Sequence, residues 1–432
     1  MSGTRVGLVC GYLEPELDGV ADYTRRLAGQ LAAIGFEPLV LTTSKLAQPA
    51  GEHAIGVTQR WDAHGVVSAA RTMRQLNLDI VHVQFAPSVF GFSRAVGLLP
   101  LFLPRHIPLI VTLHEYGVWS GHGPGRRARA ALWSAAERRG IADRETLLLT
   151  PQARSLLIPS PEHLDVLRHR FGQRIPLTRE VPIGVNVTIT AADRARARAD
   201  VRCELGVPAD TPIVAFFGFL HPDKALDQLI ASVAALQGRW LGCQLFLIGG
   251  VVSHSVPAAD AYRMRVELER VAAAHGMREQ IHITGYLPDA EVTRLLQAAD
   301  VAVFPFKAGV TRKSSSLLAA FAAGIPAVAT TPPGQVPESG EVDGVLRVPA
   351  SEPLALTDAL ARVLSDRAVA DRLVAAGRMQ VAKQSWDAIA AAHAEVYRCA
   401  LVRGDGDSWT RTAEPSRVVP STMVEGDADV TA

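Results

Sequence analysis

The chain has 432 residues, and because a typical domain has about 150, this length fits two domains better than one. Hydrophobic residues make up 48% of the chain, which excludes a disordered or fibrous protein. The 44 lysines and arginines balance 43 acidic residues, so the formal net charge of +1 gives no general electrostatic reason to expect nucleic-acid binding. The four cysteines form no CxxC pair, which excludes a sequence-evident zinc knuckle or disulfide scaffold, and we expect no metal site; they are Cys10, Cys203, Cys243 and Cys399.

The sequence contains no recognisable targeting segment. The apolar run at residues 6–10 has the length of a strand and lacks a cleavage site of small residues. The longest apolar stretch, residues 95–104, is too short to span a bilayer and contains two prolines. We therefore expect a cytoplasmic protein.

The first half of the chain alternates short β-branched runs with longer amphipathic stretches, a pattern typical of βαβ units around a parallel sheet. Apolar side chains spaced three or four apart predict a helix that ends at Gly35; they are Val20, Tyr23, Leu27, Leu31 and Ile34. A further strand ends near residue 158, before a helix with Ser160 as N-cap and Pro161 at its first position. The other predicted strands are 5–10, 38–42, 79–84, 108–113 and 146–150.

A second alternation of strands and helices begins after about residue 187. The predicted strands are 213–217, 244–248, 280–284, 301–304 and 327–330, and the predicted helices are 225–237, 260–274, 289–298 and 317–323. The chain is helical again from about 364 to 401. We therefore predict an α/β fold with two Rossmann-like doubly wound domains, at 1–186 and 187–384, followed by a helix at 385–403 and a disordered tail at 404–432.

Ligands of open parallel sheets bind beyond the carboxyl ends of the strands, so the loops that follow the strands are the candidate sites. The loop from Gly218 to Lys224 contains Pro222, which places Lys224 in the first turn of the predicted helix. A bound anion would bring the ammonium and the free amides of the helix start to one phosphate. The alternative is a solvated surface lysine.

Two further loops of the second half also follow predicted strands and are candidate ligand-binding loops. Arg312 and Lys313 directly precede Ser314 and Ser315, which can cap the next helix, so this segment predicts a second phosphate contact. Its alternative is an exposed basic loop. Gly249 and Gly250 follow another strand and would let the backbone approach a ligand closely, although a glycine there is often only a turn.

The first half offers a different kind of candidate. The loop at residues 11–19 lacks the GxGxxG spacing, so a nicotinamide cofactor is not supported. His114 directly follows a predicted strand and could contact a sugar hydroxyl or move a proton, or it could be structural, whereas His82 is expected in the core. The arginine-rich segment 125–140 is either a helix on an anionic lipid surface or a solvated helix face, and the second is favoured.

Across residues 5–400 the chain resembles glycosyltransferases of the GT-B fold, family 4 (group 1, retaining). In the first half the resemblance lies in the run GVADYTRRL from Gly19 and in VTLHE, which ends at Glu115. In the second half it lies in segments 216–224, 284–288, 299–301 and 323–326. Ser385, Trp386 and the helix that follows resemble the segment that crosses back onto the first domain in this family.

The resemblance implies transfer of a sugar, with retention and without a metal, from a nucleotide-sugar donor to an acceptor hydroxyl across a cleft between the domains. Lys224 would hold the donor diphosphate and His114 would touch the transferred sugar, so these two are the expected catalytic residues. The predicted acceptor residues are Asp22, Gln84 and Glu115. The predicted donor residues are Gly19, Gly218, Phe219, Lys224, Gly249, Gly250, Tyr286, Leu287, Arg312, Lys313, Ser314 and Ser315. The acceptor would be a sugar, a lipid-linked molecule or a small molecule, with peripheral contact to the inner membrane face through 125–140.

The chain departs from the family pattern at three positions. Phe219 stands where the family usually has an arginine, and Thr311 and Ala319 stand where it has two glutamates, the second of which contacts the ribose. Arg312 and Lys313 could replace the charge that is missing at Phe219. These departures leave two alternatives open, which are a catalytically lapsed protein that binds a nucleotide sugar or a partner, and a nucleotide-sugar 2-epimerase.

Overall fold

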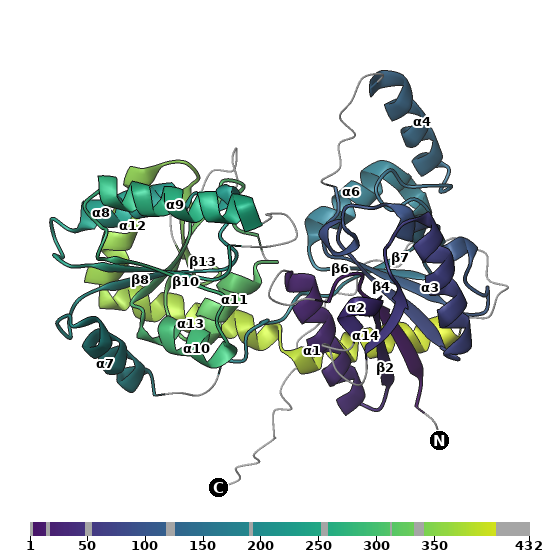
Figure 1. Cartoon of the computed structure of the whole chain (residues 1–432), viewed down its shortest axis with the longest axis horizontal. Coiled ribbons are helices and arrows are strands. Elements are labelled where there is room, and N and C mark those ends of the chain that lie inside the picture. The colour runs from purple at the N-terminus through teal and green to yellow at the C-terminus, as the bar shows by residue number, and fades with distance from the viewer. Residues whose placement is uncertain are drawn as a thin grey trace, which may run out of the picture.

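The computed structural model of the chain describes residues 3–13, 18–47, 54–117, 126–189, 193–251, 258–311, 313–331 and 341–402. It contains two α/β domains that lie side by side (Figure 1). The predicted tail at 404–432 and Arg312 lie outside the described residues.

The first domain is built on a parallel sheet in the order β3-β2-β1-β4-β5-β6-β7. Its strands are β1 (Arg5–Val9), β2 (Glu37–Thr43), β3 (Ala54–Thr58), β4 (Ile80–Phe85), β5 (Leu109–Leu113), β6 (Ser155–Ile158) and β7 (Leu177–Glu180). The order reverses direction between β1 and β4, as in a doubly wound nucleotide-binding sheet, so the switch point lies at the carboxyl ends of these two strands.

Helices cover both faces of the first sheet. The first of them, α1 (Gly19–Ala33), begins where the Asp18 side chain accepts a hydrogen bond from the Val20 amide at 2.8 Å. Of the predicted apolar stripe it buries Tyr23, Leu27 and Leu31, whereas Val20 is partly buried and Ile34, the C-cap, is exposed. The domain also contains α2 (Ser44–Ala47), α3 (Ala63–Gln75), α4 (Arg126–Arg138), α5 (Leu149–Gln152) and α6 (Pro161–Phe171), with 3-10 turns η1 (Ser88–Phe90), η2 (Ala95–Leu101) and η3 (Gly172–Arg174).

The second domain repeats this topology in the order β10-β9-β8-β11-β12-β14-β13, parallel except for β13. Its strands are β8 (Ile213–Phe217), β9 (Gln244–Ile248), β10 (Ile281–Gly285), β11 (Val301–Phe304), β12 (Ala327–Thr331), β13 (Glu341–Val342) and β14 (Val345–Pro349). Successive residues of β8 enter two separate hydrophobic clusters, one on each face, which explains why this strand is apolar throughout.

The helices of the second domain alternate with its strands along most of the chain. They are α7 (Arg194–Leu205), η4 (Pro222–Lys224), α8 (Leu226–Leu236), α9 (Ala258–Ala274), α10 (Asp289–Ala298), α11 (Ser315–Ala322), α12 (Pro353–Ser365) and α13 (Arg367–Lys383).

The last described helix, α14 (Trp386–Val402), crosses from the second domain onto the first (Figure 1). Its residues Ile389, Val396 and Tyr397 belong to the hydrophobic core of the first domain. At its start, Trp386 donates a hydrogen bond from Nε1 to the Val185 carbonyl at 2.8 Å. The two domains are therefore joined both by the chain near residue 187 and by this helix.

The prediction of a strand at residues 146–150 is wrong. Asp143 and Leu147 form an isolated bridge instead, and α5 begins at Leu149. The buried Asp143 carboxylate accepts hydrogen bonds from the Thr146 amide at 2.7 Å and the Thr146 hydroxyl at 3.0 Å. Such local side-chain bonds offer the backbone an alternative to a strand ladder, and they hold this segment in a turn.

Candidate functional site

Three loops of the second domain meet at the carboxyl edge of its sheet. The Gly218 amide donates to the Ile248 carbonyl at 3.0 Å, and the Leu220 amide donates to Gly250 at 2.9 Å. The Lys307 amide donates to the Asp223 carbonyl at 2.9 Å. The loops after β8, β9 and β11 are thus hydrogen-bonded to one another at the switch point of the sheet, where doubly wound folds bind ligands.

Two of the predicted glycines are required by this close packing. Gly249 has φ +142°, and a Cβ there would lie 2.1 Å from the Gly218 carbonyl oxygen. Gly218 has φ +138°, and a Cβ there would lie 2.8 Å from the Ser316 hydroxyl at the start of α11. Both positions exclude a side chain because of backbone geometry and neighbouring protein atoms. The glycines thus allow the loops to pack closely against one another and against α11.

Lys224 was expected in the first turn of the helix that follows it. It belongs instead to the short turn η4, which precedes α8. Ala225 has a left-handed φ of +47°, so the chain turns there and α8 begins at Leu226. The Lys224 Nζ lies 3.5 Å from the centroid of the Phe306 ring. Burial lowers the pKa of Lys224 to about 8, although Asp223 and Glu115 favour the charged form. The ammonium is therefore charged at neutral pH and held over an aromatic face.

Lys313 points across to the first domain. Its Nζ lies 3.5 Å from Nε2 of His163, in the first turn of α6. The Ser314 hydroxyl accepts a hydrogen bond from the Leu317 amide at 3.3 Å, so Ser314 is the N-cap of α11, as the sequence predicts. Ser315 is the first residue of that helix, which starts two residues earlier than expected.

Glu115 of the first domain lies near both lysines. Although Glu115 keeps an exposed surface, partial desolvation of its carboxyl and the charge of Asp18 raise its pKa, whereas Lys313 and Lys224 lower it. Both lysines therefore lie close enough to Glu115 for their charges to act on its carboxylate. This arrangement joins the two predicted phosphate-binding loops.

His114 follows β5 and is only 8% exposed. Its Nε2 lies 2.8 Å from Oε1 of Gln84, and its ring packs edge-on against Tyr23 with centroids 4.8 Å apart. Burial lowers the pKa of His114 to about 3, with further contributions from His393, His163 and Lys313. The imidazole is therefore neutral at physiological pH. Gln84, a predicted acceptor residue, is fully buried and lies behind His114.

Gly19 and Asp22 lie at the junction of the domains. The Asn186 side chain donates to the Gly19 carbonyl at 3.1 Å. Asp22 pairs with Arg26, which also reaches Asp289 of α10 at 2.8 Å. Burial raises the pKa of Asp22 to about 6, despite the opposing charge of Arg26. The predicted acceptor role of Asp22 stays a prediction, since the structure shows it within an interdomain ion-pair cluster.

The remaining predicted positions lie around the edge of the second sheet. Tyr286 is half exposed directly after β10, while Phe219 and Leu287 are partly buried. Thr311 is also partly buried, and its carbonyl accepts a hydrogen bond from the Ser314 amide at 3.2 Å. Ala319 is 1% exposed and packs in the hydrophobic cluster beneath α11. The Ala319 methyl group can make no polar contact to a ribose.

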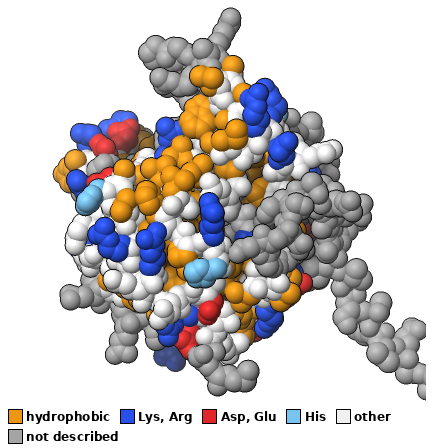
Figure 2. Space-filling model, turned by 90° about the vertical axis from the view of Figure 1, so that its right-hand side faces the viewer, with side chains coloured by type: hydrophobic (Ala, Val, Ile, Leu, Met, Phe, Trp, Pro, Cys, Tyr) orange, Lys and Arg blue, Asp and Glu red, His pale blue; other side chains and the backbone are white. Residues whose placement is uncertain are grey.

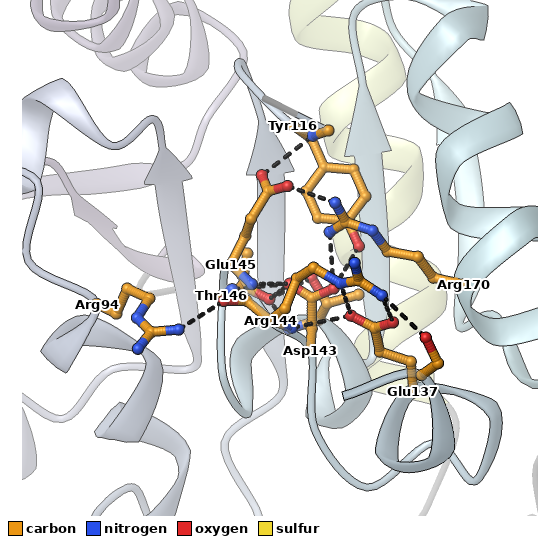
Figure 3. Close-up of polar contacts among 11 residues, drawn as sticks. Arg94, Tyr116, Glu137, Asp143, Arg144, Glu145, Thr146 and Arg170 are labelled. Atoms are coloured by element: carbon orange, nitrogen blue, oxygen red, sulfur yellow. Dashed lines mark hydrogen bonds and ion pairs between the residues drawn. The ribbon is translucent and has the colours of Figure 1, made fainter. Parts of the chain in front are cut away.

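A buried ionic network supports the segment that follows His114 (Figure 3). Arg170 lies 3.1 Å from Asp143 and 2.5 Å from Glu145, and both carboxylates are fully buried. The Tyr116 hydroxyl donates to Asp143 at 2.7 Å, and the Gly117 amide donates to Glu145 at 3.0 Å. The network fixes the backbone on the far side of Glu115.

Sequence reasoning missed this network, together with His163 and Phe306. The network joins the segments around Tyr116, Asp143 and Arg170, which are 25 or more residues apart in the chain. A pattern of nearby residues cannot predict such a cluster. Phe306 could have been found, because it lies two residues after the end of β11, at the edge of the sheet where ligands bind.

The segment predicted to contact lipid includes α4, which projects from the body of the first domain (Figure 1). Leu132 on this helix is 72% exposed, and Leu101 at the end of η2 is 58% exposed. Figure 2 shows hydrophobic side chains gathered on this end of the molecule with lysines and arginines among them. Contact with a lipid surface stays a prediction. None of the described helices is long and apolar enough to cross a membrane.

Within the part of the chain that the structure describes, no group of three or more His, Cys, Asp or Glu side chains is arranged to hold a metal ion. Among the described residues, Lys224, Lys307, Lys313 and Arg347 place positive charge at the two loops.

Comparison with known proteins identifies both halves of the chain. The family model described as "Glycosyltransferase Family 4" matches residues 17–188, and the model described as "Glycosyl transferases group 1" matches residues 211–366. The D-inositol 3-phosphate glycosyltransferase of Corynebacterium glutamicum is 29% identical over 349 residues, 80% of this chain and 78% of that protein. The protein of the same name from Streptomyces bingchenggensis is 27% identical over 413 residues, covering 89% and 85%.

Solved structures share the whole architecture. A sucrose-phosphate synthase from Thermosynechococcus elongatus superposes with a TM-score of 0.67 at 21% identity, covering 92% of this chain and 99% of that one. HepE of Anabaena, solved with UDP and glucose, gives 0.68 at 15% identity, covering 92% and 100%. These likenesses support the two-domain GT-B fold. Since the two family models together account for both domains, the chain belongs to the group 1, family 4 glycosyltransferases.

Proposed function

We propose that the protein transfers a sugar from a nucleotide-diphosphate sugar to an acceptor hydroxyl, with retention at the anomeric carbon and without a metal ion. The observation that carries this proposal is that the loops bearing Lys224 and Lys313 are hydrogen-bonded to each other at the switch point of the sheet, with Lys313 Nζ 3.5 Å from Nε2 of His163 in the first domain. Two fixed cations at the switch point of one domain, opposite polar groups of the other, suit a diphosphate that bridges to a sugar.

The two lysines supply the charge that the reaction needs. As the bond from the sugar to the diphosphate breaks, negative charge grows on the leaving nucleotide, and preorganised cations stabilise that charge more than they stabilise the ground state. Lys224 is the catalytic cation in this proposal. Lys313, with Arg312 beside it in sequence and the capped start of α11, binds the diphosphate.

His114 binds the sugar through a neutral ring nitrogen, because its low pKa prevents it from acting as a cation at neutral pH. Glu115 and Asp22 are proposed to face the acceptor. The other proposed donor contacts are the loop residues Gly218, Phe219, Gly249 and Gly250, the residues Tyr286 and Leu287 after β10, and Gly19 at the domain junction.

The relatives suggest the first substrates to test. HepE structures are described with UDP and glucose and with UDP-glucose, and the curated relatives are named D-inositol 3-phosphate glycosyltransferases. We propose a nucleotide sugar as donor and a small hydroxylated acceptor, with a polyol phosphate as one class among them. Retention is tested by the anomeric configuration of the product, read by NMR.

The decisive assay measures nucleotide release from UDP-, GDP-, ADP- and dTDP-sugars, with inositol 3-phosphate or a cell extract as acceptor. Lys224→Ala should lower turnover at least ~100-fold, the scale for loss of one preorganised contact to a developing charge. Lys307→Ala is the matched control, because Lys307 is exposed on the neighbouring loop. Equal activity of the Lys224→Ala protein and the wild type would contradict the proposal that Lys224 holds the donor diphosphate.

The two alternatives have separate readouts in the same assay. The buried methyl group of Ala319 and the absence of a carboxylate at Thr311 favour a lapsed protein, which would bind a donor and release no nucleotide under any condition. An epimerase would change the configuration of the sugar at C2 without any acceptor, which NMR of the recovered sugar detects.

A further inference from the structure

A stripe of buried polar side chains crosses the first sheet on the face where α14 packs. It consists of His82 and Gln84 on β4 and of Thr112 and His114 at the carboxyl end of β5. None of the four is more than 8% exposed. Burying polar groups costs free energy unless they are hydrogen-bonded, so the bonds of this polar stripe determine how each group is oriented.

His82 is held between two hydroxyl groups. Its Nδ1 lies 2.7 Å from the Tyr397 hydroxyl on α14, and its Nε2 lies 2.8 Å from the Thr112 hydroxyl. Tyr397 is itself fully buried. A hydroxyl can donate or accept, so either neutral form of His82 satisfies both bonds, and together they fix the plane of the ring.

The amide group of Gln84 lies over this ring. Its Nε2 is 3.3 Å from Nδ1 and 3.1 Å from Nε2 of His82. A nitrogen almost equidistant from both ring nitrogens lies over the ring face, because in the ring plane it would overlap the carbon between them. The π face of an aromatic ring attracts N–H groups and repels a carbonyl oxygen. The amide nitrogen therefore faces His82, and the amide oxygen faces His114.

This orientation determines which nitrogen of His114 carries the proton. Oε1 of Gln84 lies 2.8 Å from Nε2 of His114, and a carbonyl oxygen can only accept. The Nε2 atom must therefore be protonated, and a neutral imidazole then has a bare Nδ1. Within the described part of the chain, Nδ1 of His114 has no hydrogen-bond partner, so it remains available to a ligand.

We propose that Gln84 and Tyr397 are positioning residues that hold His114 as the Nε2–H tautomer, with Nδ1 accepting a hydrogen bond from a hydroxyl of the bound sugar. Tyr397 acts through His82, and Gln84 acts directly. The contact to sugar rests on the function proposed above, whereas the tautomer is a property of the free protein. The helix that crosses between the domains thereby takes part in ordering the site.

The test is NMR of the full-length protein carrying histidine labelled with ¹⁵N in the ring. Long-range ¹H–¹⁵N correlations distinguish the two neutral tautomers, and the signals of His114 are identified by their loss in His114→Gln. The wild type should show a protonated Nε2 and a bare Nδ1. Gln84→Met should give a mixture of tautomers at His114, and Tyr397→Phe a smaller change in the same direction.

The second domain provides a matched control. There Gln244 is also buried, and its Oε1 lies 2.8 Å from Nε2 of His282. Gln244→Met should alter the signals of His282 and leave those of His114 and the rate of transfer unchanged. Gln84→Met should lower kcat about tenfold or more with KM for the donor within about twofold, as expected when an orienting partner of a functional histidine is removed.

Several results would overturn the proposal. A wild-type His114 protonated at Nδ1 would do so without any variant, as would an unchanged tautomer in Gln84→Met. If Gln84→Met does not fold, the wild-type spectrum and Tyr397→Phe decide. If Gln84→Met changes the tautomer of His114 but leaves kcat unchanged, the proposed contact of His114 with the sugar is wrong. If the spectra are as expected but the wild type transfers no sugar, the positioning roles stand and the proposed function fails.

Discussion

Lys224 occupies an environment that makes its charge sensitive to pH in a useful range. Burial against Phe306 lowers its pKa to about 8, so the free protein loses this charge just above physiological pH. A bound diphosphate favours the charged form and must raise the pKa of the same group. Binding of the donor and protonation of Lys224 are therefore linked.

This linkage predicts how donor affinity changes with pH. Below pH 8 the ammonium is already charged and affinity should be constant. Above pH 8 the dissociation constant should rise by up to about tenfold per pH unit, until the pKa of the bound state is reached. Lys224→Arg should abolish this dependence, because arginine keeps its charge throughout. Isothermal titration of a bound nucleotide sugar between pH 6.5 and 9.5 measures it, and an identical slope in both proteins would contradict the role of Lys224.

His114 should matter more for the reaction than for nucleotide binding. It lies on the first domain, whereas the proposed diphosphate contacts lie on the second. His114→Ala should therefore lower kcat while the affinity for the nucleotide alone stays within about twofold. Comparing single-turnover rates with nucleotide titrations separates the two effects. Equal losses in both would show that His114 is not beside the sugar.

The sequence allowed Lys224, Lys313 and His114 to be predicted as site candidates, because each directly follows a predicted strand or precedes a predicted helix. It did not allow the surroundings to be predicted. The position of Lys224 in a separate turn depends on the left-handed Ala225, and alanine gives no local signal for that conformation. The contact of Lys224 with the Phe306 ring joins two loops, and the bond of Gln84 to His114 joins the ends of two strands; spacing along the chain specifies neither pairing.

Among the elements, the segment between β5 and β6 depends on the ionic network of Arg170, Asp143 and Glu145. Fully buried charges are stable only when they are paired. Tyr116 packs its ring 4.7 Å from the Arg170 guanidinium and adds a hydrogen bond to Asp143. The network thus couples α6 to the backbone that carries Glu115.

Arg170→Met should lower the free energy of unfolding by about 3–5 kcal/mol, because two buried carboxylates would lose their compensating charge. Arg168→Met is the matched control on the same helix. Its ion pair with Asp165 is largely exposed, so the change should be below about 1 kcal/mol. Chemical denaturation followed by fluorescence measures both variants. Equal midpoints for the two would contradict the structural role of the network.

Secondary structure could be predicted best where periodicity was long or strands were wholly apolar. The helix that packs Tyr23 and Leu27 against the sheet, and the strand at 244–248, were predicted in this way and are confirmed. Strands β3, β7, β13 and β14 were missed; β3 contains Gly56, β7 carries the charged residues Arg179 and Glu180, and β13 has only two residues. Short edge strands have few apolar residues, so their pattern resembles a loop.

The whole molecule is held in its present arrangement partly by a polar contact between the domains. Arg26 on α1 pairs with Asp289 at 2.8 Å, and it also donates to the Thr188 hydroxyl at 3.0 Å. The Thr188 amide donates to the same Asp289 carboxylate at 2.8 Å. Partly exposed ion pairs contribute only about 0.2–1 kcal/mol, so this contact favours the present arrangement of the domains only weakly.

Asp289→Asn should therefore change the population of the present arrangement, relative to other interdomain distances, by no more than about fivefold. The variant should also remove the effect of salt concentration on the distribution of interdomain distances. The chain offers a labelling pair for this measurement, because Cys203 on α7 and Cys399 on α14 are exposed while Cys10 and Cys243 are buried. Spin labels on the exposed pair report the distance.

Glu291→Gln is the control for this variant. Glu291 pairs with Arg294 within α10 itself, so its removal should leave the interdomain distances and their salt dependence unchanged. If Asp289→Asn gave the same distances and the same salt dependence as the wild type, the Arg26–Asp289 pair would have no part in the arrangement of the domains.

The central claim is that the second domain holds a diphosphate between Lys224 and the start of α11, facing His114 of the first domain. The most direct measurement is a crystal structure of the full chain with the nucleotide diphosphate that binds it. We predict a diphosphate oxygen within hydrogen-bond distance of Lys224 Nζ and another at Lys313 or the amides that follow Ser314. A nucleotide bound elsewhere, with both lysines left in contact only with solvent, would contradict the claim.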